Sequence, residues 1–276
     1  MNRTPVVLVH GAWFHKSSWR NWAERFTSYG FDVHVPGWPG EAVSAAADRR
    51  RPGPHRDLGL ETLIDHYELF VRSLDSRPVL VGHSLGGLVV QHLFSAGLGR
   101  AAVALAPWQG GGVSTDEPRT WVWSLAANGS ADNDGFAQLP KSYFRNAVAN
   151  TVGEEEAARL FERHVVPAPR RLLADLGFGR GGDHPEAFRP ARIVVDTADA
   201  ARGPLLLISG QEDRVVPDAV TRAAYKAYGD CAAVTDLKQF ADRGHSLVID
   251  SGWRTVADHV LVWLAANGIE SVTTEP

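Results

Sequence analysis

Hydrophobic and polar positions along the first hundred residues predict strands and helices in alternation. Short apolar or β-branched runs bounded by turn residues are typical of buried strands, and apolar residues three and four positions apart are typical of helices. The expected strands cover residues 6–9, 32–36, 78–81 and 101–105. The expected helices cover residues 19–26, 60–74 and 85–98. This alternation predicts a parallel sheet with helices on both faces.

The middle of the chain, residues 108–200, breaks this rhythm. Glycine runs at 110–112 and 181–182, many prolines and scattered aromatic residues interrupt it. We therefore expect a core domain made of residues 1–107 and 201–276, with the middle segment inserted as a cap. Inside the cap, Thr151 followed by Glu154 has the spacing of a capping box and predicts a helix that ends before Pro167.

The alternation of strands and helices resumes after the cap. Strands are expected over 204–209 and 232–238, and helices over 218–228 and 256–266. Trp263 and Leu264 are expected to pack the last helix onto the sheet, and the tail after Ile269 is expected to fray.

Residues 82–86, with the sequence GHSLG, stand directly between an expected strand and an expected helix. The G-x-S-x-G pattern alone is weak evidence, because a chain rich in glycine and serine can contain it by chance. Its position is more specific, since a nucleophile on a sharp strand-to-helix turn needs small neighbours around a strained backbone. Gly82, Gly86 and Gly87 meet this need, so Ser84 is the candidate nucleophile.

Backbone amides beside this turn are candidates for the oxyanion hole. The helix that begins at Leu85 directs its N-terminal amides toward the serine. The segment His10-Gly11-Ala12 ends the first strand, so the N–H groups of Ala12 and Leu85 are expected to form the hole together. His10 is expected to have a structural role, bonding the backbone near the turn.

Ser84 needs a base, and we select it among the eleven histidines by their positions relative to the expected strands and helices. His245 lies in a turn-rich loop, residues 242–246, that follows a strand and precedes the last helix. A histidine there can project over the carboxyl edge of the sheet. The other candidates fall in helices or beside the nucleophile, where packing or surface exposure explains them: His66, His83, His92 and His259.

Asp213 is the candidate acid that orients His245. It follows the next-to-last expected strand, and the chain order Ser, Asp, His is one of the orders in which known catalytic triads occur. Glu212 is the main competitor for this role, and Asp236 and Asp242 are weaker ones.

Composition and net charge limit the classes of molecule that the protein is expected to bind. The formal net charge is −4 and the sequence is 44% hydrophobic and 22% charged, which is typical of a globular protein without long-range attraction for nucleic acid or anionic lipid. We expect a small-molecule substrate, no nucleic acid and no membrane partner. A homodimer is the candidate assembly.

Cofactors, metals and targeting signals are not indicated. A single cysteine, Cys231, allows neither an intrachain disulfide nor a cysteine-based metal cluster. The glycines of the turn do not form a dinucleotide fingerprint, so we expect no cofactor and no metal. The apolar run over 6–9 is too short for a signal peptide, and we expect the protein in the cytoplasm.

With these residues in hand, the chain resembles the α/β-hydrolase superfamily from about Pro5 to Ala266. Residues 10–13, with Trp19 and Trp22, are similar to the small esterase and hydroxynitrile-lyase-like branch of bacterial serine hydrolases. The resemblance implies an eight-stranded, mostly parallel sheet with a helical cap inserted after the sixth strand. It also implies triad roles for Ser84, Asp213 and His245.

The function expected from these features is cleavage of a carboxylic ester or lactone of a small to medium apolar substrate through an acyl-serine. A triad-based lyase or carbon-carbon bond hydrolase is one alternative, since one fold hosts many reactions. A slow-turnover ligand-binding protein is another. Candidate pocket residues are Trp13, Trp38, His83, Trp108, Trp121, Trp123, Phe136, Tyr143 and Phe144.

Overall fold

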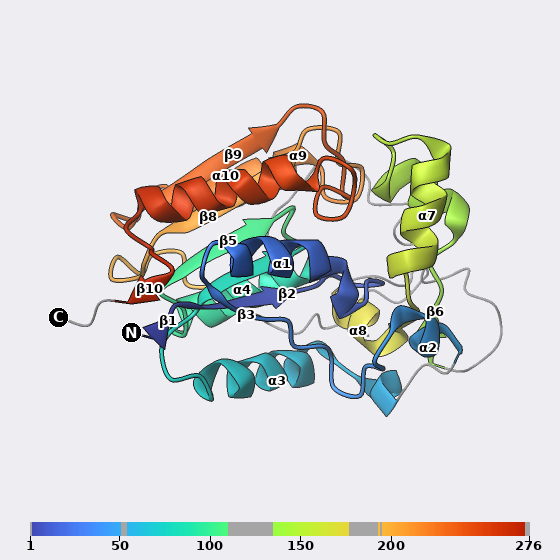
Figure 1. Ribbon diagram of the computed structural model, residues 1–276, viewed down its shortest axis with the longest axis horizontal. Coiled ribbons are helices and arrows are strands. Elements are labelled where there is room, and N and C mark those ends of the chain that lie inside the picture. Colours follow the sequence, from blue (N-terminus) through green and yellow to red (C-terminus); the bar gives the residue numbers. More distant parts are fainter. Residues whose placement is uncertain (1, 51–53, 110–134, 177–192, 194, 274–276) are drawn as a thin grey trace, which may run out of the picture.

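One parallel sheet organises the chain in the computed structural model, which describes residues 2–50, 54–109, 135–176, 193 and 195–273 (Figure 1). Its six strands stand in the spatial order β3, β2, β4, β5, β8, β9. They are β2 (Pro5–Val9), β3 (Asp32–His34), β4 (Val79–His83), β5 (Ala101–Leu105), β8 (Leu205–Gly210) and β9 (Thr235–Phe240). Every pairing between them is parallel, so the expected α/β class is confirmed.

The sheet has six strands within the described residues, and not the expected eight. The N-terminal strand β1 (Asn2–Arg3) pairs antiparallel with β10 (Val272–Thr273) and so forms a separate two-stranded ladder. Next to it, the Thr4 amide donates to the Ser271 carbonyl at 2.8 Å. The expectation that the chain frays after Ile269 is therefore wrong as far as Thr273, because this pairing between distant segments holds the tail.

Helices cover both faces of the sheet, as expected. On one face, α1 (Arg20–Ser28) packs against α10 (Trp253–Ala266), and on the other α3 (Leu60–Arg72) packs against α4 (Leu85–Ser95) (Figure 1). A short 3-10 turn, η1 (Lys16–Trp19), leads into α1, and α9 (Asp218–Ala227) packs on β8 and β9. Apolar residues at helical spacing explain the docking of α1: Trp22 and Phe26 are fully buried, and the Trp22 indole donates to the Val248 carbonyl at 3.0 Å.

The segment between β5 and β8 holds several short elements beyond the carboxyl ends of the strands, at the right of Figure 1. Two-residue strands β6 (Phe136–Ala137) and β7 (Ala168–Pro169) pair antiparallel. The helices are α6 (Lys141–Tyr143), the π-helical turn η3 (Phe144–Val148), α7 (Glu154–His164) and α8 (Arg170–Asp175). The shorter α2 (Ala45–Arg50) and η2 (Pro54–Asp57) lie against α7 and α8 respectively.

The helix predicted inside this segment exists, but its start differs from the expected capping box. α7 begins at Glu154 with Gly153 as its N-cap and no side-chain cap bond, so Thr151 does not cap it. Three glutamates in the first turn, Glu154 to Glu156, favour the helix dipole instead. The helix ends at His164, before Pro167 as expected.

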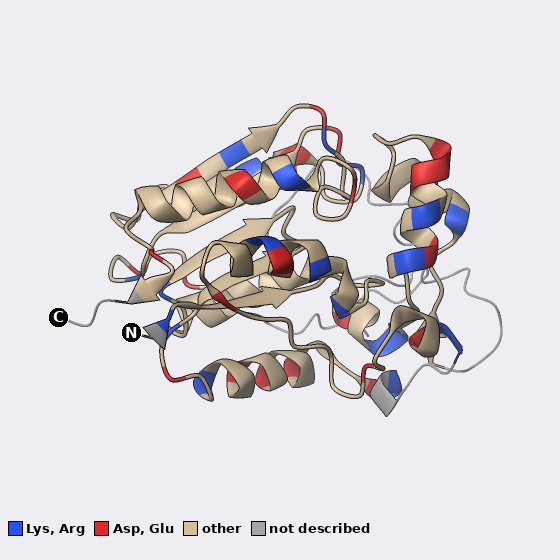
Figure 2. Ribbon diagram, in the orientation of Figure 1, with Lys and Arg blue, Asp and Glu red and all other residues tan. Residues whose placement is uncertain are grey.

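Acidic and basic side chains share the same helices (Figure 2). Pairs four residues apart, such as Glu68 with Arg72 and Glu155 with Arg159, place opposite charges beside each other. No described helix combines the length and apolar character needed to cross a bilayer.

Candidate active site

Ser84, Asp213 and His245 converge at one edge of the sheet. Ser84 follows β4, Asp213 follows β8, and His245 lies in the loop after β9. Because the strands are parallel, the loops after their carboxyl ends meet at the same edge. All three side chains are buried, with exposed fractions of 8%, 5% and 4%.

Asp213 fixes the orientation of His245. Its Oδ2 accepts a hydrogen bond from His245 Nδ1 at 2.8 Å. Its Oδ1 accepts from the amides of Val215 and Val216 at 2.7 and 2.8 Å, which aims the carboxylate at the imidazole. With a proton on Nδ1, the neutral imidazole leaves Nε2 as an acceptor, which is the form that a general base for serine requires.

Ser84 sits on a strained turn between β4 and α4. Its φ is 55° and its ψ is −117°, a conformation that non-glycine residues rarely adopt. The turn is held because the Ser84 amide donates to Leu105 and its carbonyl accepts from Gly87 and Trp108, each at 2.9 Å. Such strain is characteristic of functional sites, where surrounding bonds hold the residue in place.

The glycines around Ser84 are required by close backbone packing. A Cβ on Gly82 would stand 2.1 Å from the Gly86 carbonyl oxygen, and one on Gly86 would stand 2.1 Å from the Val9 carbonyl oxygen. A Cβ on Gly11 would stand 2.9 Å from Ser84 Cβ, so the loop after β2 also approaches the serine closely. Larger residues at these positions would push β2, β4 and α4 apart.

The two residues expected to supply the oxyanion hole lie beside Ser84, and both line the same cavity as the serine. Leu85 is the first residue of α4, so its amide has no acceptor one turn earlier in the helix. Ala12 follows Gly11 in the loop after β2, where Trp13 also has a positive φ of 60°. The positions of both residues suit them to hydrogen-bond an oxygen bound at Ser84.

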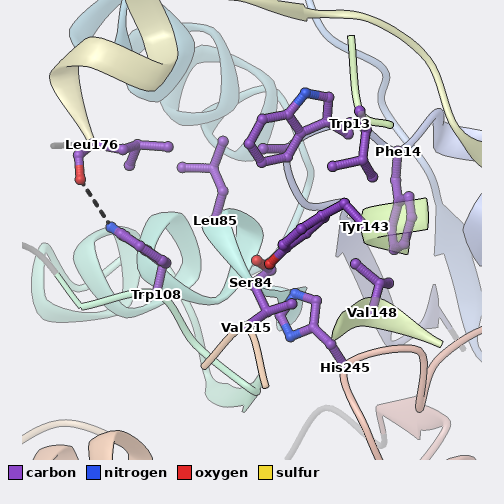
Figure 3. Close-up of a pocket in the computed structure, with 12 residues that line it drawn as sticks. Trp13, Phe14, Ser84, Leu85, Trp108, Tyr143, Val148, Leu176, Val215 and His245 are labelled. Carbon is purple, nitrogen blue, oxygen red and sulfur yellow. Dashed lines mark hydrogen bonds between the residues drawn. The ribbon is translucent and has the colours of Figure 1, made fainter. Parts of the chain in front are cut away.

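A largely apolar cavity lies over Ser84 and His245 (Figure 3). The indole N–H groups of two of its tryptophans are bonded to backbone, Trp13 to Ala137 and Trp108 to Leu176, at 3.1 and 3.2 Å. The lining consists of Ala12, Trp13, Phe14, Ser84, Leu85, Trp108, Leu139, Tyr143, Val148, Leu176, Val215 and His245.

Of the aromatic residues expected to form the pocket, Trp13, Trp108 and Tyr143 line this cavity. Trp121 and Trp123 fall outside the described residues.

Four residues expected in the pocket are not in its lining, and each has another environment. Trp38 stacks on His10 with ring centroids 4.9 Å apart. Phe144 packs edge-on against Phe14 and Phe161. Phe136 is buried in β6.

His83 is the fourth, and it contacts His245 instead of lining the cavity. Its Nε2 donates to the His245 carbonyl at 2.9 Å, and its ring contacts Phe14 and the His245 ring. Burial, with a smaller contribution from the charge of His245, holds the pKa of His83 well below its ordinary value. A neutral His83 therefore supports the loop that carries His245.

The short elements between β5 and β8 are bonded to the loops that carry Asp213 and His245. The Ser246 amide donates to the Val148 carbonyl at 2.9 Å, and the Asn150 side chain donates to the Glu212 carbonyl at 2.9 Å. The Arg214 side chain reaches the Asn146 carbonyl at 3.2 Å. The π-helical turn η3 is thus held against the loops of both Asp213 and His245, and π turns recur at functional sites.

Sequence reasoning did not find several lining residues. Phe14 directly follows Trp13, and Val215 lies two residues after Asp213, so each is close to a residue that the sequence identified. Leu139, Val148 and Leu176 carry no such signal, because ordinary aliphatic residues reach the cavity only through the path of the chain after β5.

One group of described residues has the composition of a metal site. His15, Glu41 and Asp48 bring ligand atoms within 4.8 Å of one another. However, His15 Nδ1 accepts from the Ser17 amide at 3.0 Å, and its Nε2 donates to the Ala42 carbonyl at 3.1 Å. Both ring nitrogens are thus used within the protein, and the group does not fit a metal ion.

Comparison with known proteins identifies the family. The model of the family described as "Alpha/beta hydrolase family" matches residues 6–259. The chain belongs to this family. Searching among curated proteins gave no match to the sequence.

Solved structures of other alpha/beta hydrolases are similar in fold at low sequence identity. An extracellular alpha/beta-hydrolase from a Paenibacillus species is 18% identical, with a TM-score of 0.66 and coverage of 96% of this chain and 99% of that one. A methylesterase from Arabidopsis is 16% identical, with a TM-score of 0.63 and coverage of 95% and 99%. A monoacylglycerol lipase from Paleococcus ferrophilus is 22% identical, with a TM-score of 0.63 and coverage of 95% and 94%. At these identities the likeness concerns the fold.

Proposed function

We propose that this alpha/beta hydrolase is a serine hydrolase that cleaves a carboxylic ester or lactone of a small to medium apolar substrate. One observation carries the proposal. Ser84, on its strained turn, and His245, oriented by Asp213 at 2.8 Å, line the same apolar cavity.

The proposed reaction has two halves. His245 Nε2 accepts the proton of the Ser84 hydroxyl as the serine oxygen attacks the acyl carbon. The amides of Ala12 and Leu85 hydrogen-bond the oxyanion that forms, and removal of one such donor typically costs about a hundredfold to a thousandfold in rate. His245 then returns the proton to the leaving alkoxide, and a water molecule hydrolyses the acyl-serine by the same route.

The lining supports an uncharged substrate. Apart from the triad and the backbone amides, aromatic and aliphatic side chains surround the cavity, and none of its described lining residues is Lys, Arg, Asp or Glu. Burying an unpaired ionic group against such walls is costly. The esterase and lipase names among the structures of similar fold are consistent with an ester substrate.

Trapping the intermediate tests the proposal. The protein is mixed with p-nitrophenyl butyrate, quenched in acid within seconds and analysed by intact mass spectrometry beside the Ser84→Ala variant. A butyryl adduct on the wild type alone, together with release of p-nitrophenol, is the expected result. Release of p-nitrophenol by the Ser84→Ala variant at the wild-type rate would contradict an acyl-serine at Ser84, and binding without turnover would favour a ligand-binding protein.

A further inference from the structure

Tyr143 adds a polar group to the apolar cavity. Figure 3 shows its ring extending across the cavity with the hydroxyl end directed toward Ser84, above His245. The two residues share the lining with Tyr143. The hydroxyl is thus at the end of the cavity where the bonds of a substrate would be made and broken.

The position of Tyr143 is fixed by its chain neighbours. It ends α6 and leads directly into the π-helical turn η3, whose first amide, Phe144, donates to Pro140 at 2.9 Å. The same turn is bonded to the loop of His245 through Val148 and Ser246, and to the loop of Asp213 through Asn146 and Arg214. The bonds of this turn therefore hold Tyr143 beside the loops of both Asp213 and His245.

The amides of the oxyanion hole donate to the carbonyl oxygen of an ester and not to its alkoxy oxygen. They belong to Ala12, in the loop after β2, and to Leu85, at the start of α4. An ester bound with its carbonyl oxygen at these amides turns its alkoxy oxygen toward His245, which must deliver a proton to it. Figure 3 shows the Tyr143 hydroxyl directed toward Ser84 above His245, which makes it a candidate donor to this alkoxy oxygen.

We propose that the Tyr143 hydroxyl donates a hydrogen bond to the alkoxy oxygen of the ester and stabilises the charge that develops there. As the tetrahedral intermediate collapses, the bond between the acyl carbon and the alkoxy oxygen breaks, and the oxygen takes the electron pair and the proton from His245 Nε2. Tyr143 keeps its own proton throughout. This inference rests on the proposed ester hydrolysis and deepens it.

The electrostatics of Tyr143 suit a donor that does not ionise. Burial, with a smaller contribution from the negative charge of Asp213, raises the pKa of Tyr143 above its ordinary value. A neutral phenol can donate to a developing alkoxide without losing its proton to solvent.

The proposal names a substrate class: esters of alkyl alcohols. Their alkoxide leaving groups are strongly basic and gain most from a donor, whereas p-nitrophenolate is a weak base that leaves with little help. Esters with a common acyl group isolate this effect, because only the leaving group then differs.

The test compares kcat/KM of the wild type and the Tyr143→Phe variant for ethyl butyrate and p-nitrophenyl butyrate. The variant keeps the ring and loses only the hydroxyl. We expect about a tenfold to hundredfold loss for the ethyl ester, the range of a charge-assisted hydrogen bond, and less than about a threefold loss for the p-nitrophenyl ester. Equal losses for the two esters, or no loss for either, would overturn the role.

Tyr228→Phe is the matched control, because it also removes a buried tyrosine hydroxyl. That hydroxyl donates to Gln91 Oε1 at 3.1 Å, away from the residues that line the cavity. The control should leave the ratio of the two kcat/KM values unchanged, and a ratio that shifts as in Tyr143→Phe would count against the proposal. If the wild type cleaves neither ester and forms no acyl adduct, the proposed function fails and this inference fails with it, whereas equal losses in the variant reject Tyr143 alone.

Discussion

His83 Nε2 donates a hydrogen bond to the backbone carbonyl of His245 at 2.9 Å. The residue immediately before Ser84 thus supports the loop that carries His245. Because burial keeps His83 neutral, one of its ring nitrogens carries no proton and the other serves as this donor. The backbone of His245 is therefore bonded to the side chain of His83, the residue that directly precedes Ser84.

Loss of this bond should reduce activity as well as stability. His83→Phe keeps a ring against Phe14 but leaves the His245 carbonyl without its donor, so we expect unfolding in urea to become easier by about 1–3 kcal/mol. We also expect kcat/KM to fall about tenfold as His245 shifts. The control is His66→Phe, which removes a comparable bond from His66 Nε2 to the Gly37 carbonyl away from the site and should affect stability alone. Wild-type kcat/KM in His83→Phe would show that His83 has no positioning role.

Asp213→Asn tests the orientation of the base. The two amides that donate to Oδ1 would select the carbonyl oxygen of the asparagine, which turns its NH₂ group toward His245. The imidazole would then carry its proton on Nε2 and could not accept the serine proton, with an expected loss of about 10⁴-fold in kcat. Glu212→Gln is the control, since Glu212 is exposed and its carbonyl, not its side chain, bonds Asn150. A large loss in the control and a small one in Asp213→Asn would move the acid to Glu212.

The sheet and the turn of Ser84 were predictable because their signals are local. Two of the strands, Pro5–Val9 and Ala101–Leu105, are buried on both faces and are apolar throughout. The glycines around Ser84 are needed because a larger residue there would clash with the adjacent backbone. The pairing of Asn2–Arg3 with Val272–Thr273 was not predictable, because it joins the two ends of the chain and neither segment has a strand pattern of its own.

Pocket residues could not be separated from packing residues for a similar reason. Trp13 and Trp38 are both tryptophans on loops after strands, yet one lines the cavity and the other stacks on His10. The difference depends on the path of the segment between β5 and β8, where the Ala137 carbonyl accepts a hydrogen bond from the Trp13 indole at 3.1 Å.

Stability should fall in mild acid partly because of His164. Burial, with a smaller contribution from the charge of Arg163, lowers the pKa of His164 from 6.5 to about 4. As pH falls from 7, His164 binds a proton in the unfolded chain but not in the folded protein, so stability is lost between about pH 6.5 and pH 4. His164 alone should cost about 2 kcal/mol between pH 7 and pH 5.

Urea unfolding at these two pH values measures the effect. The difference between pH 7 and pH 5 should be smaller in His164→Gln than in the wild type, with buried His83 contributing to what remains. An identical difference in the two proteins would mean that His164 is protonated in the folded state.

The most direct measurement is intact mass spectrometry after treatment with a fluorophosphonate, which reacts with a serine only when an adjacent base activates it. We predict a single phosphonyl adduct on the wild type and on Ser95→Ala, a control whose hydroxyl bonds the His92 carbonyl in α4, and none on Ser84→Ala. An unlabelled, folded wild-type protein, or a Ser84→Ala variant labelled like the wild type, would contradict the assignment of Ser84 as the activated nucleophile.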